Sequence, residues 1–448
     1  TILLSYAIME YEKGAAMSML ITNVLLNEQN AAIFIDDGYI KSVFNEDQLP
    51  PQNDADELID GGGAYVVPAL KNGHTHAAMT LLRGFADDMK LQPWLEEKIW
   101  PTEAKLTAED IYWGTRLAAL EMIKSGTIFF TDMYFHFPES RQAIIDSGIK
   151  AASGPALLDF FDEEAGRERR REMQELLEKY GSSDPQNGQV LFTPAPHSIY
   201  TVSSKTLRWL GDFTRDNSLP LHIHVSETKQ EVDDCTAQHG MRPVEYLDSL
   251  GLLSQRTVAA HSVWLNEKEL DLLAKRGVTV VHNPVSNMKL SSGSCFPFKE
   301  IRDRKIPMMI GTDGCSSNNN LDLFEEMKIA ALLQKHHFGN PELLSAEEVF
   351  AMGTGAAAGL GSEQGVYPHI SSEIKVGAHA DLLLIDPDHV QMVPNYNLIS
   401  NLVYSAGAAA VDTLVCRGKV LMRSGQVEGE EETVRHARRC AQALIDRA

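Results

Sequence analysis

Eight short apolar runs alternate with segments of helical character across the middle of the chain, and this alternation restricts the fold more than any other feature. Buried parallel strands are typically short and almost continuously apolar. The eight runs begin near Val66, Thr127, Ile149, Val190, Leu219, Thr257, Val278 and Ile306, with expected helices at 108–124, 205–216, 267–276 and 321–335. Such alternation indicates βα units and a parallel sheet. Eight units predict an α/β fold with a closed (β/α)8 TIM-like barrel, whose active site lies at the C-terminal ends of the strands.

The two ends of the chain have a different sequence pattern, with short β-rich runs separated by turn residues. Residues 19–68 are expected to form a small antiparallel unit, and residues 374–427 show the same pattern. We therefore predict one composite β-sandwich domain from residues 17–66 and 374–448, which ends in an amphipathic helix over 432–447. Residues 67–373 are predicted to be the metal-dependent catalytic barrel.

Composition limits the partners. The net charge of −22 argues against nucleic acid, which binds clustered Lys and Arg, and no apolar run reaches the length of a membrane span. The five cysteines are scattered and never spaced as Cys-x-x-Cys, which disfavours a disulfide framework and a thiolate zinc cluster and favours the reducing cytoplasm. Residues 1–16 lack a basic region before their apolar patch and resemble an upstream extension more than a secretory signal. The sequence leaves open whether they belong to the native folded protein.

Polar side chains gather at the ends of the predicted strands. The strand-end residues are His74 and His76 on the first strand, His197 on the fourth, His224 and nearby Glu227 on the fifth, His261 on the sixth, His282 on the seventh and Asp313 on the eighth. A single strand histidine is often a hydrogen-bonded core residue. Six of the fifteen histidines at strand ends are harder to explain in that way, because a barrel brings these ends together.

His74 and His76 are two residues apart, so in a strand their side chains point to the same face. With His224 and Asp313 they form three imidazoles and one carboxylate, a set that suits one zinc ion, or alternatively ferrous iron, with an open position for water. His222 shares the strand face of His224, and spacing alone allows either as the ligand. We choose His224 because it is nearer the mouth of the barrel.

A metal in such a site lowers the pKa of bound water from 15.7 to about 7 and so provides a hydroxide at neutral pH. Hydrolysis at an electron-poor carbon also needs a proton donor, and Glu227 is expected to fill that role. The alternative for Glu227 is a first-turn acid that stabilises the helix beginning near Thr228. His261 is expected to orient the water or stabilise developing charge, and Asp313 to accept the proton of the attacking water.

Several motifs together carry a family resemblance. They are residues 68–76, His224-Val225-Ser226-Glu227, Ala260-His261-Ser262, residues 282–290, Gly311-Thr312-Asp313-Gly314 and, more specifically, residues 79–84, Trp94-Leu95 and Trp100-Pro101-Thr102-Glu103. With these motifs the chain resembles the amidohydrolase superfamily, and within it the 5-methylthioadenosine/S-adenosylhomocysteine deaminases of the chlorohydrolase-like group. The resemblance implies a mononuclear metal site, with Glu103 on the ribose hydroxyls, Trp94 along the nucleoside pocket and His197 on the purine. His282 is predicted to be a further substrate contact. Taken alone, Glu103 could be a helix-terminal acid and Trp94 a core aromatic.

The resemblance has departures. Lys71 and Gly73 stand where an apolar residue and a threonine or serine are usual, and the third strand has Ala152-Ser153-Gly154-Pro155 where an arginine can hold the amino-acid tail of S-adenosylhomocysteine. Arg167, Arg169, Arg170 or Arg171 could replace that arginine, or could simply form a solvated helix face. Because that arginine is absent from the third strand, we expect methylthioadenosine or a related adenosine as substrate in preference to S-adenosylhomocysteine.

The expected reaction converts a 6-aminopurine nucleoside (5'-methylthioadenosine, S-adenosylhomocysteine or adenosine) to the inosine-type product and ammonia, by attack of a metal-bound hydroxide on C6. The alternatives are another amidohydrolase, such as a guanine, triazine or pterin deaminase or a chlorohydrolase, and a catalytically silent scaffold. We expect a small-molecule substrate, a homo-oligomer, and neither nucleic acid nor a membrane as partner.

Overall fold

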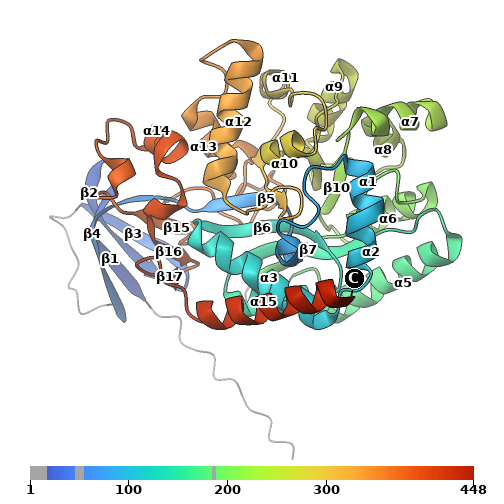
Figure 1. Ribbon diagram of the computed structural model, residues 1–448. Coiled ribbons are helices and arrows are strands. Elements are labelled where there is room, and N and C mark those ends of the chain that lie inside the picture. The colour runs from blue at the N-terminus through green and yellow to red at the C-terminus, as the bar shows by residue number, and fades with distance from the viewer. Residues whose placement is uncertain (1–17, 46–54, 184–187, 448) are drawn as a thin grey trace, which may run out of the picture.

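The computed structural model describes residues 18–45, 55–183 and 188–447. The predicted extension at residues 1–16 lies outside these ranges. Figure 1 shows a β-rich part beside a larger part in which helices surround a set of strands. The larger part contains the candidate site.

Eight parallel strands and two short additional ones form the centre of the larger part. They are β5 (Leu70–His76), β6 (Thr127–Tyr134), β7 (Lys150–Leu157), β8 (Val190–Phe192), β9 (Ala195–Pro196), β10 (Leu221–Val225), β11 (Thr257–His261), β12 (Thr279–His282), β13 (Met308–Ile310) and β14 (Asp313–Gly314). The strand orders are β14-β5-β6-β7-β8 and β10-β11-β12-β13, with β9 beside β7. Seven of the eight predicted strand starts fall within two residues of an observed one.

The two parallel sheets adjoin at both ends, as the predicted barrel requires. On one side the His222 N–H donates to the Pro194 carbonyl over 3.1 Å. On the other side the Asn72 side chain connects β5 to the turn after β13, because its amide oxygen accepts the Thr312 N–H at 3.1 Å and its amide nitrogen donates to the Thr312 hydroxyl at 2.7 Å. The strand ends therefore face one common space.

The helices around these strands cover their outer faces. They include α3 (Ala108–Lys124), α4 (Phe137–Ser147), α5 (Glu163–Tyr180), α6 (Ser204–Asp216), α7 (Lys229–His239), α8 (Pro243–Ser249), α9 (Glu267–Arg276), α10 (Pro284–Lys289), α11 (Phe298–Asp303), α12 (Leu323–Phe338) and α13 (Ala346–Gly353). The four helices named from the sequence are all present, and two of them, α3 and α9, have the predicted bounds. A further segment, α1 (Leu91–Trp94), η4 (Leu95–Ile99) and α2 (Trp100–Glu103), follows β5 and η3 (Ala77–Leu82).

The first barrel strand begins later than the sequence predicted. The apolar residues Val66 and Val67 belong to β4 (Glu57–Pro68), and β5 begins only at Leu70. One almost continuous extended stretch thus contributes strands to two sheets, which the apolar run alone does not reveal.

Close packing explains why residue 73 is a glycine. A Cβ at this position would lie 2.9 Å from the Met309 Cβ and the Val281 Cγ1.

The β-rich part is a seven-stranded sheet from both ends of the chain, as predicted. Its order is β17-β16-β15-β4-β1-β2-β3, with β1 (Met19–Leu26), β2 (Gln29–Asp36), β3 (Tyr39–Asn45), β15 (Leu382–Ile385), β16 (Val411–Cys416) and β17 (Lys419–Met422). Apolar side chains of six of these strands form one buried cluster. The β1–β4 pair is parallel, so the expectation of a purely antiparallel N-terminal unit was wrong on this point.

The predicted final helix is α15 (Glu430–Arg447), and it lies along the barrel helix α3 (Figure 1). The His436 ring stacks on Trp113 at 4.1 Å, and Arg439 and Arg447 form ion pairs with Glu109 and Asp110. The helix therefore packs on the barrel as well as following the sheet in sequence. The proposed domain boundaries at residues 66 and 374 remain predictions.

Lys71 is fully buried on β5 and donates a hydrogen bond to the Ala69 carbonyl at 2.6 Å. Burial lowers the pKa of Lys71 to about 7, against the opposing effect of Asp381. The unfolded chain binds this proton up to about pH 10.4, so Lys71 makes the free energy of unfolding rise with pH between about 7 and 10.4. We expect Lys71→Met to raise the thermal midpoint, by more at pH 7 than at pH 9, since the apolar side chain avoids the cost of keeping an amine charged in a buried site.

Lys150 provides the contrasting variant. It is also buried, and it forms an ion pair with buried Asp381. Lys150→Met should lower the thermal midpoint, because it leaves a buried carboxylate without its main partner at a cost of about 3–5 kcal/mol. Scanning fluorimetry of both variants at pH 7 and pH 9 measures the thermal midpoints. An equal change of the midpoint for Lys71→Met at the two pH values would contradict the proposed coupling of stability to the protonation of Lys71.

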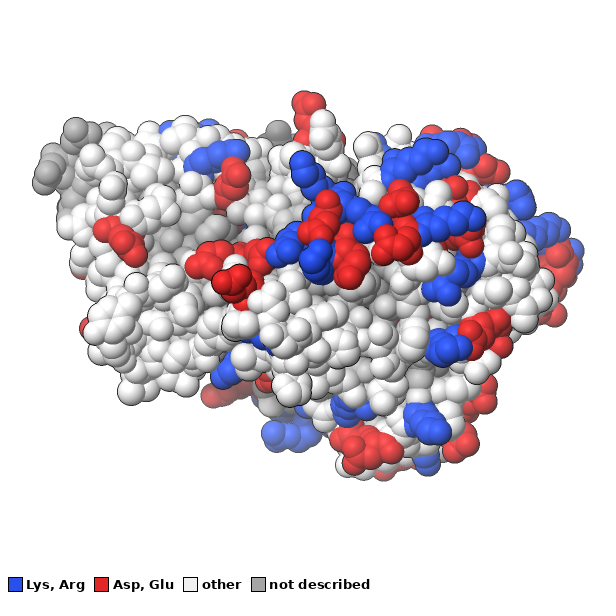
Figure 2. All heavy atoms as spheres, turned by 90° about the horizontal axis from the view of Figure 1, so that it is seen from above, with Lys and Arg blue, Asp and Glu red and all other residues white. Residues whose placement is uncertain are grey.

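The outer surface carries charges of both signs. On the face in Figure 2, the basic side chains of the described residues lie among acidic ones and form no continuous basic area. Among the described residues, no helix combines the length and apolar character needed to cross a membrane. All five cysteines are free.

Candidate metal centre and active site

Four predicted ligand side chains converge at the C-terminal ends of the strands. The Nε2 atoms of His74 and His76 each lie 3.2 Å from the Asp313 Oδ1, and the His224 Nε2 lies 3.3 Å from the His76 Nε2. The short β14–β5 pairing aligns Asp313 with Thr75 and so brings the carboxylate beside the two histidines. Three imidazole nitrogens and one carboxylate oxygen thus face the same small space.

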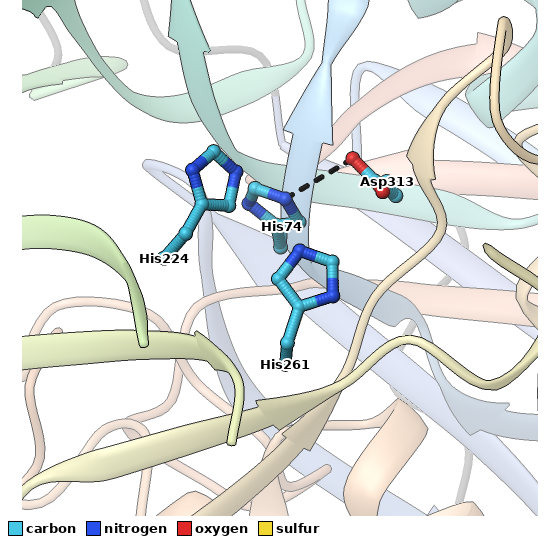
Figure 3. Close-up of side chains that lie close together, drawn as sticks. All are labelled: His74, His224, His261 and Asp313. Atoms are coloured by element: carbon cyan, nitrogen blue, oxygen red, sulfur yellow. Dashed lines mark ion pairs between the residues drawn. The ribbon is translucent and has the colours of Figure 1, made fainter. Parts of the chain in front are cut away.

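His261 lies against the same group. Ligand atoms of His74, His224, His261 and Asp313 are all within 4.8 Å of one another, and Figure 3 shows the three rings and the carboxylate turned toward each other. We predicted His261 as a catalytic residue and His76 as a ligand. The geometry allows either histidine to complete a set of four, and we propose His76 because its Nε2 lies 3.2 Å from the Asp313 Oδ1 and 3.3 Å from the His224 Nε2.

The donor set fits zinc. Tetrahedral zinc with bonds of about 2.0–2.2 Å places neighbouring ligand atoms about 3.3–3.6 Å apart, close to the 3.2–3.3 Å separations found here. The His74 Nε2 is buried and has no hydrogen-bond partner, which is costly unless the atom has another use. The site can therefore hold one divalent metal ion.

The second nitrogen of each ring has a partner that fixes the ring. The Nδ1 atoms of His76 and His224 lie 2.7 Å from the carbonyls of Met133 and His197, to which they donate. The His74 Nδ1 is 2.8 Å from the His222 Nε2, so His222 lies behind His74, one layer deeper, as expected. Such partners leave Nε2 free to bind a metal.

Asp313 is held in a similar way. Its Oδ2 accepts hydrogen bonds from the hydroxyls of Ser286 at 2.6 Å and Ser317 at 3.0 Å. Burial alone would raise the pKa of Asp313, but the His74 and His76 rings beside it outweigh burial and hold it well below its usual range. Asp313 is thus an oriented carboxylate. We had not predicted Ser286 and Ser317, although Ser286 lies within the quoted 282–290 motif.

Glu227 lies two residues after the end of β10 and is 5% exposed. Its Oε2 is 3.8 Å from the His261 Nε2, and the His261 Nδ1 lies 2.8 Å from the Asn287 Oδ1. Burial raises the pKa of Glu227, which favours the protonated form that a proton donor needs. Asn287, which fixes the His261 ring, was missed by sequence reasoning because its partner is distant in the sequence.

A cavity opens above these groups, and its empty space, open mouth included, is about 610 Å³. The predicted site residues on its wall are His76, Trp94, Glu103, His197, His224, Glu227, His261 and Asp313. His282 does not line the cavity. Its ring stacks on Phe296 at 4.3 Å and both of its nitrogens lack hydrogen-bond partners, so the geometry gives no support to a substrate contact.

Glu103 and Trp94 come from the α1–α2 segment, which covers one side of the cavity. The Glu103 Oε1 accepts a hydrogen bond from the Tyr134 hydroxyl at 2.8 Å. Burial raises the pKa of Glu103 to about 7. The Glu103 side chain thus lines the cavity. Tyr134 also lines this cavity, and the sequence did not single it out.

A second cavity adjoins the first and shares Trp100, Glu103, Phe135, Ala156 and Leu158 with it. Of the four arginines considered for substrate binding, only Arg169 is on its wall, where it pairs with Glu172 at 2.6 Å. Arg167 is 57% exposed and pairs with Glu164. The other walls are largely apolar.

Comparisons with known proteins show which proteins the chain is similar to. The model of the Amidohydrolase family matches residues 65–421. A 5'-deoxyadenosine deaminase of Methanoregula boonei is 46% identical over 437 residues, which is 97% of each chain. The 5-methylthioadenosine/S-adenosylhomocysteine deaminase 1 of Archaeoglobus fulgidus is 45% identical over 383 residues, 85% of this chain and 88% of that one. A crystal structure of a zinc-bound adenosine deaminase from Xanthomonas campestris superimposes with a TM-score of 0.85 at 31% identity, covering 96% of this chain and 99% of that chain.

Proposed function

This chain belongs to the amidohydrolase family, and we propose that it is a metal-dependent deaminase of 6-aminopurine nucleosides that releases ammonia and leaves an inosine-type product. One observation carries the proposal: Glu227, Glu103 and three of the four proposed metal ligands, His76, His224 and Asp313, line the same cavity. The metal ligands and Glu227 would carry out the hydrolysis, and Glu103 would select a nucleoside by binding its ribose.

The residues have distinct roles in this reaction. We propose His74, His76, His224 and Asp313 as the metal ligands, and zinc, when bound, lowers the pKa of a water ligand to about 7 and so supplies a nucleophile for C6. Asp313 would accept the proton of that water and pass it to the leaving amine, and His261 would stabilise the negative charge that develops beside it. Glu227 would donate a proton to the ring nitrogen, so that ammonia leaves as the 6-oxo group forms.

Substrate selection follows from the cavity walls. The Glu103 carboxylate accepts hydrogen bonds from the two vicinal ribose hydroxyls, Trp94 packs on the nucleoside and His197 contacts the purine. The 5'-substituent enters the adjoining cavity beyond Glu103, whose walls include Trp100, Phe135 and Leu158. Small apolar substituents suit these walls, so we propose 5'-deoxyadenosine and methylthioadenosine as better substrates than S-adenosylhomocysteine.

Glu103→Gln tests the nucleoside assignment. Loss of the charged acceptor removes strong hydrogen bonds worth about 1.5–3 kcal/mol each, so we expect kcat/KM for methylthioadenosine to fall about 10²-fold or more, mainly through KM. The measurement is the release of ammonia from methylthioadenosine, 5'-deoxyadenosine, S-adenosylhomocysteine, adenosine, adenine and guanine, with the loss of 6-aminopurine absorbance as a second readout for all of them except guanine.

The ribose-free bases are the internal control in this assay. Glu103→Gln should leave any turnover of adenine or guanine unchanged, because these bases have no hydroxyls for Glu103 to bind. Tyr134→Phe, which removes only the donor to Glu103, should have a smaller effect. If the wild-type protein turned over guanine rapidly and none of the nucleosides, the nucleoside assignment would be wrong, and the protein would act on free bases.

The wider context remains a proposal. We propose that the enzyme works in the cytoplasm as a homo-oligomer on a small-molecule substrate. The five free cysteines support a reducing compartment. Size-exclusion chromatography with light scattering measures the oligomeric state directly.

A further inference from the structure

Glu231, one helical turn beyond Glu227, is the feature from which we draw a further inference. Glu231 is the third residue of α7 and is 5% exposed. Its Oε1 accepts the Ser226 N–H at 2.9 Å, and its Oε2 accepts the Glu227 N–H at 2.8 Å. Both carboxylate oxygens thus bind the backbone that carries the proton donor.

This arrangement differs from ordinary helix capping. A glutamate at the third helical position normally accepts the N–H of the N-cap residue in a capping box. The N-cap of α7 is Thr228, and its side chain does accept the Glu231 N–H at 3.1 Å. The Glu231 carboxylate, however, does not accept the Thr228 N–H of the capping box but the N–H groups of the two preceding residues, Ser226 and Glu227. Helix stability alone does not require that.

The backbone that Glu231 binds is strained. Ser226 has φ = +52°, a left-handed conformation that residues other than glycine rarely adopt. Its carbonyl accepts the N–H groups of Val263 and Trp264, at 3.1 and 2.9 Å. The turn is therefore held from one side by Glu231 and from the other by the segment that follows His261, and strain of this kind persists only where the surroundings fix it.

We propose that Glu231 is a positioning residue that holds the backbone of Ser226 and Glu227, and thereby keeps the Glu227 carboxyl beside His261 and the metal cluster. Glu231 does not line the substrate cavity, so it acts through Glu227. Displacement of a catalytic group by about 1 Å can reduce the rate about 10²-fold. Burial raises the pKa of Glu231 to about 7, and the hydrogen bonds from the two N–H groups oppose that rise.

Glu231→Gln tests the proposal, with Glu269→Gln as the matched control. Glu269 is the third residue of α9 and is fully buried, but it forms a capping box with Asn266 and pairs with Arg242, away from the cavity. We expect Glu231→Gln to reduce kcat about 10–100-fold, with KM within about threefold of wild type and bound metal unchanged. Glu269→Gln should lower the thermal midpoint and leave kcat within about threefold.

A second measurement separates this proposal from the proposed function on which it rests. Amide hydrogen exchange, followed by mass spectrometry on the metal-loaded proteins, should accelerate in the peptide covering 226–231 in Glu231→Gln only. If the wild-type protein turns over no nucleoside, the proposed function is wrong. The exchange measurement still tests whether Glu231 holds the backbone of Ser226 and Glu227. Unchanged exchange, or a loss of kcat that only matches a loss of metal or of folded protein, would overturn the positioning role.

Discussion

Replacing Glu227 by glutamine should lower kcat for methylthioadenosine by about 10²–10⁴-fold, the usual contribution of a general acid or base, and leave the bound metal in place. Glutamine has the same shape and can occupy the same position after β10. It cannot deliver a proton to the ring nitrogen. Steady-state absorbance assays together with metal analysis of the purified variant measure both parts of this expectation.

The ratio of kcat to KM effects distinguishes Glu227 from the other cavity acids. Glu227→Gln should act on kcat, because its proton transfer belongs to the chemical step. Glu103→Gln should act mainly on KM, since its hydrogen bonds form when the ribose binds. A Glu227→Gln variant that keeps more than about a tenth of the wild-type kcat would argue against the proton-donor role and would direct attention to His261 and Asp313.

The sequence predicted the parts of this site that depend on strand ends. Parallel strands are recognisable as apolar runs, and a barrel brings their C-terminal ends together. His74, His76, His224 and Asp313, although spread over 240 residues, could therefore be assigned to one place. The reason is topological: the position of each residue near the end of its strand brings it to this space, although spacing alone did not distinguish His224 from His222.

The sequence did not predict contacts that depend on rotamers and on cross-chain pairing. Asn287 beside His261, Ser317 beside Asp313 and Tyr134 beside Glu103 are ordinary polar residues until the fold brings them to their partners. His282 shows the opposite limit. It ends a strand as the others do, but its ring lies on Phe296 outside the cavity, because the position in a strand does not determine which way the side chain of its last residue turns.

The metal itself should be indispensable. Removing zinc with a chelator should abolish nucleoside turnover, and added zinc should restore it, because without the metal no other group of this cluster can supply a nucleophile at neutral pH. The metal should also stabilise the fold. A ligand at 100 times its Kd contributes about 2.7 kcal/mol to the free energy of unfolding, so the thermal midpoint of the chelated protein should be lower by several degrees.

Two histidine variants decide which four side chains hold the metal. The distances favour His74, His76, His224 and Asp313, so His76→Asn should weaken zinc binding by at least about 10²-fold in a competition assay with a chromophoric chelator. His261→Asn should keep stoichiometric zinc and lose kcat. His239→Asn, on α7 with its ring stacked on Tyr246, is the control and should change neither quantity. The reverse result, with zinc lost from His261→Asn and kept in His76→Asn, would instead assign the fourth ligand to His261, which the geometry also places within 4.8 Å of His74, His224 and Asp313.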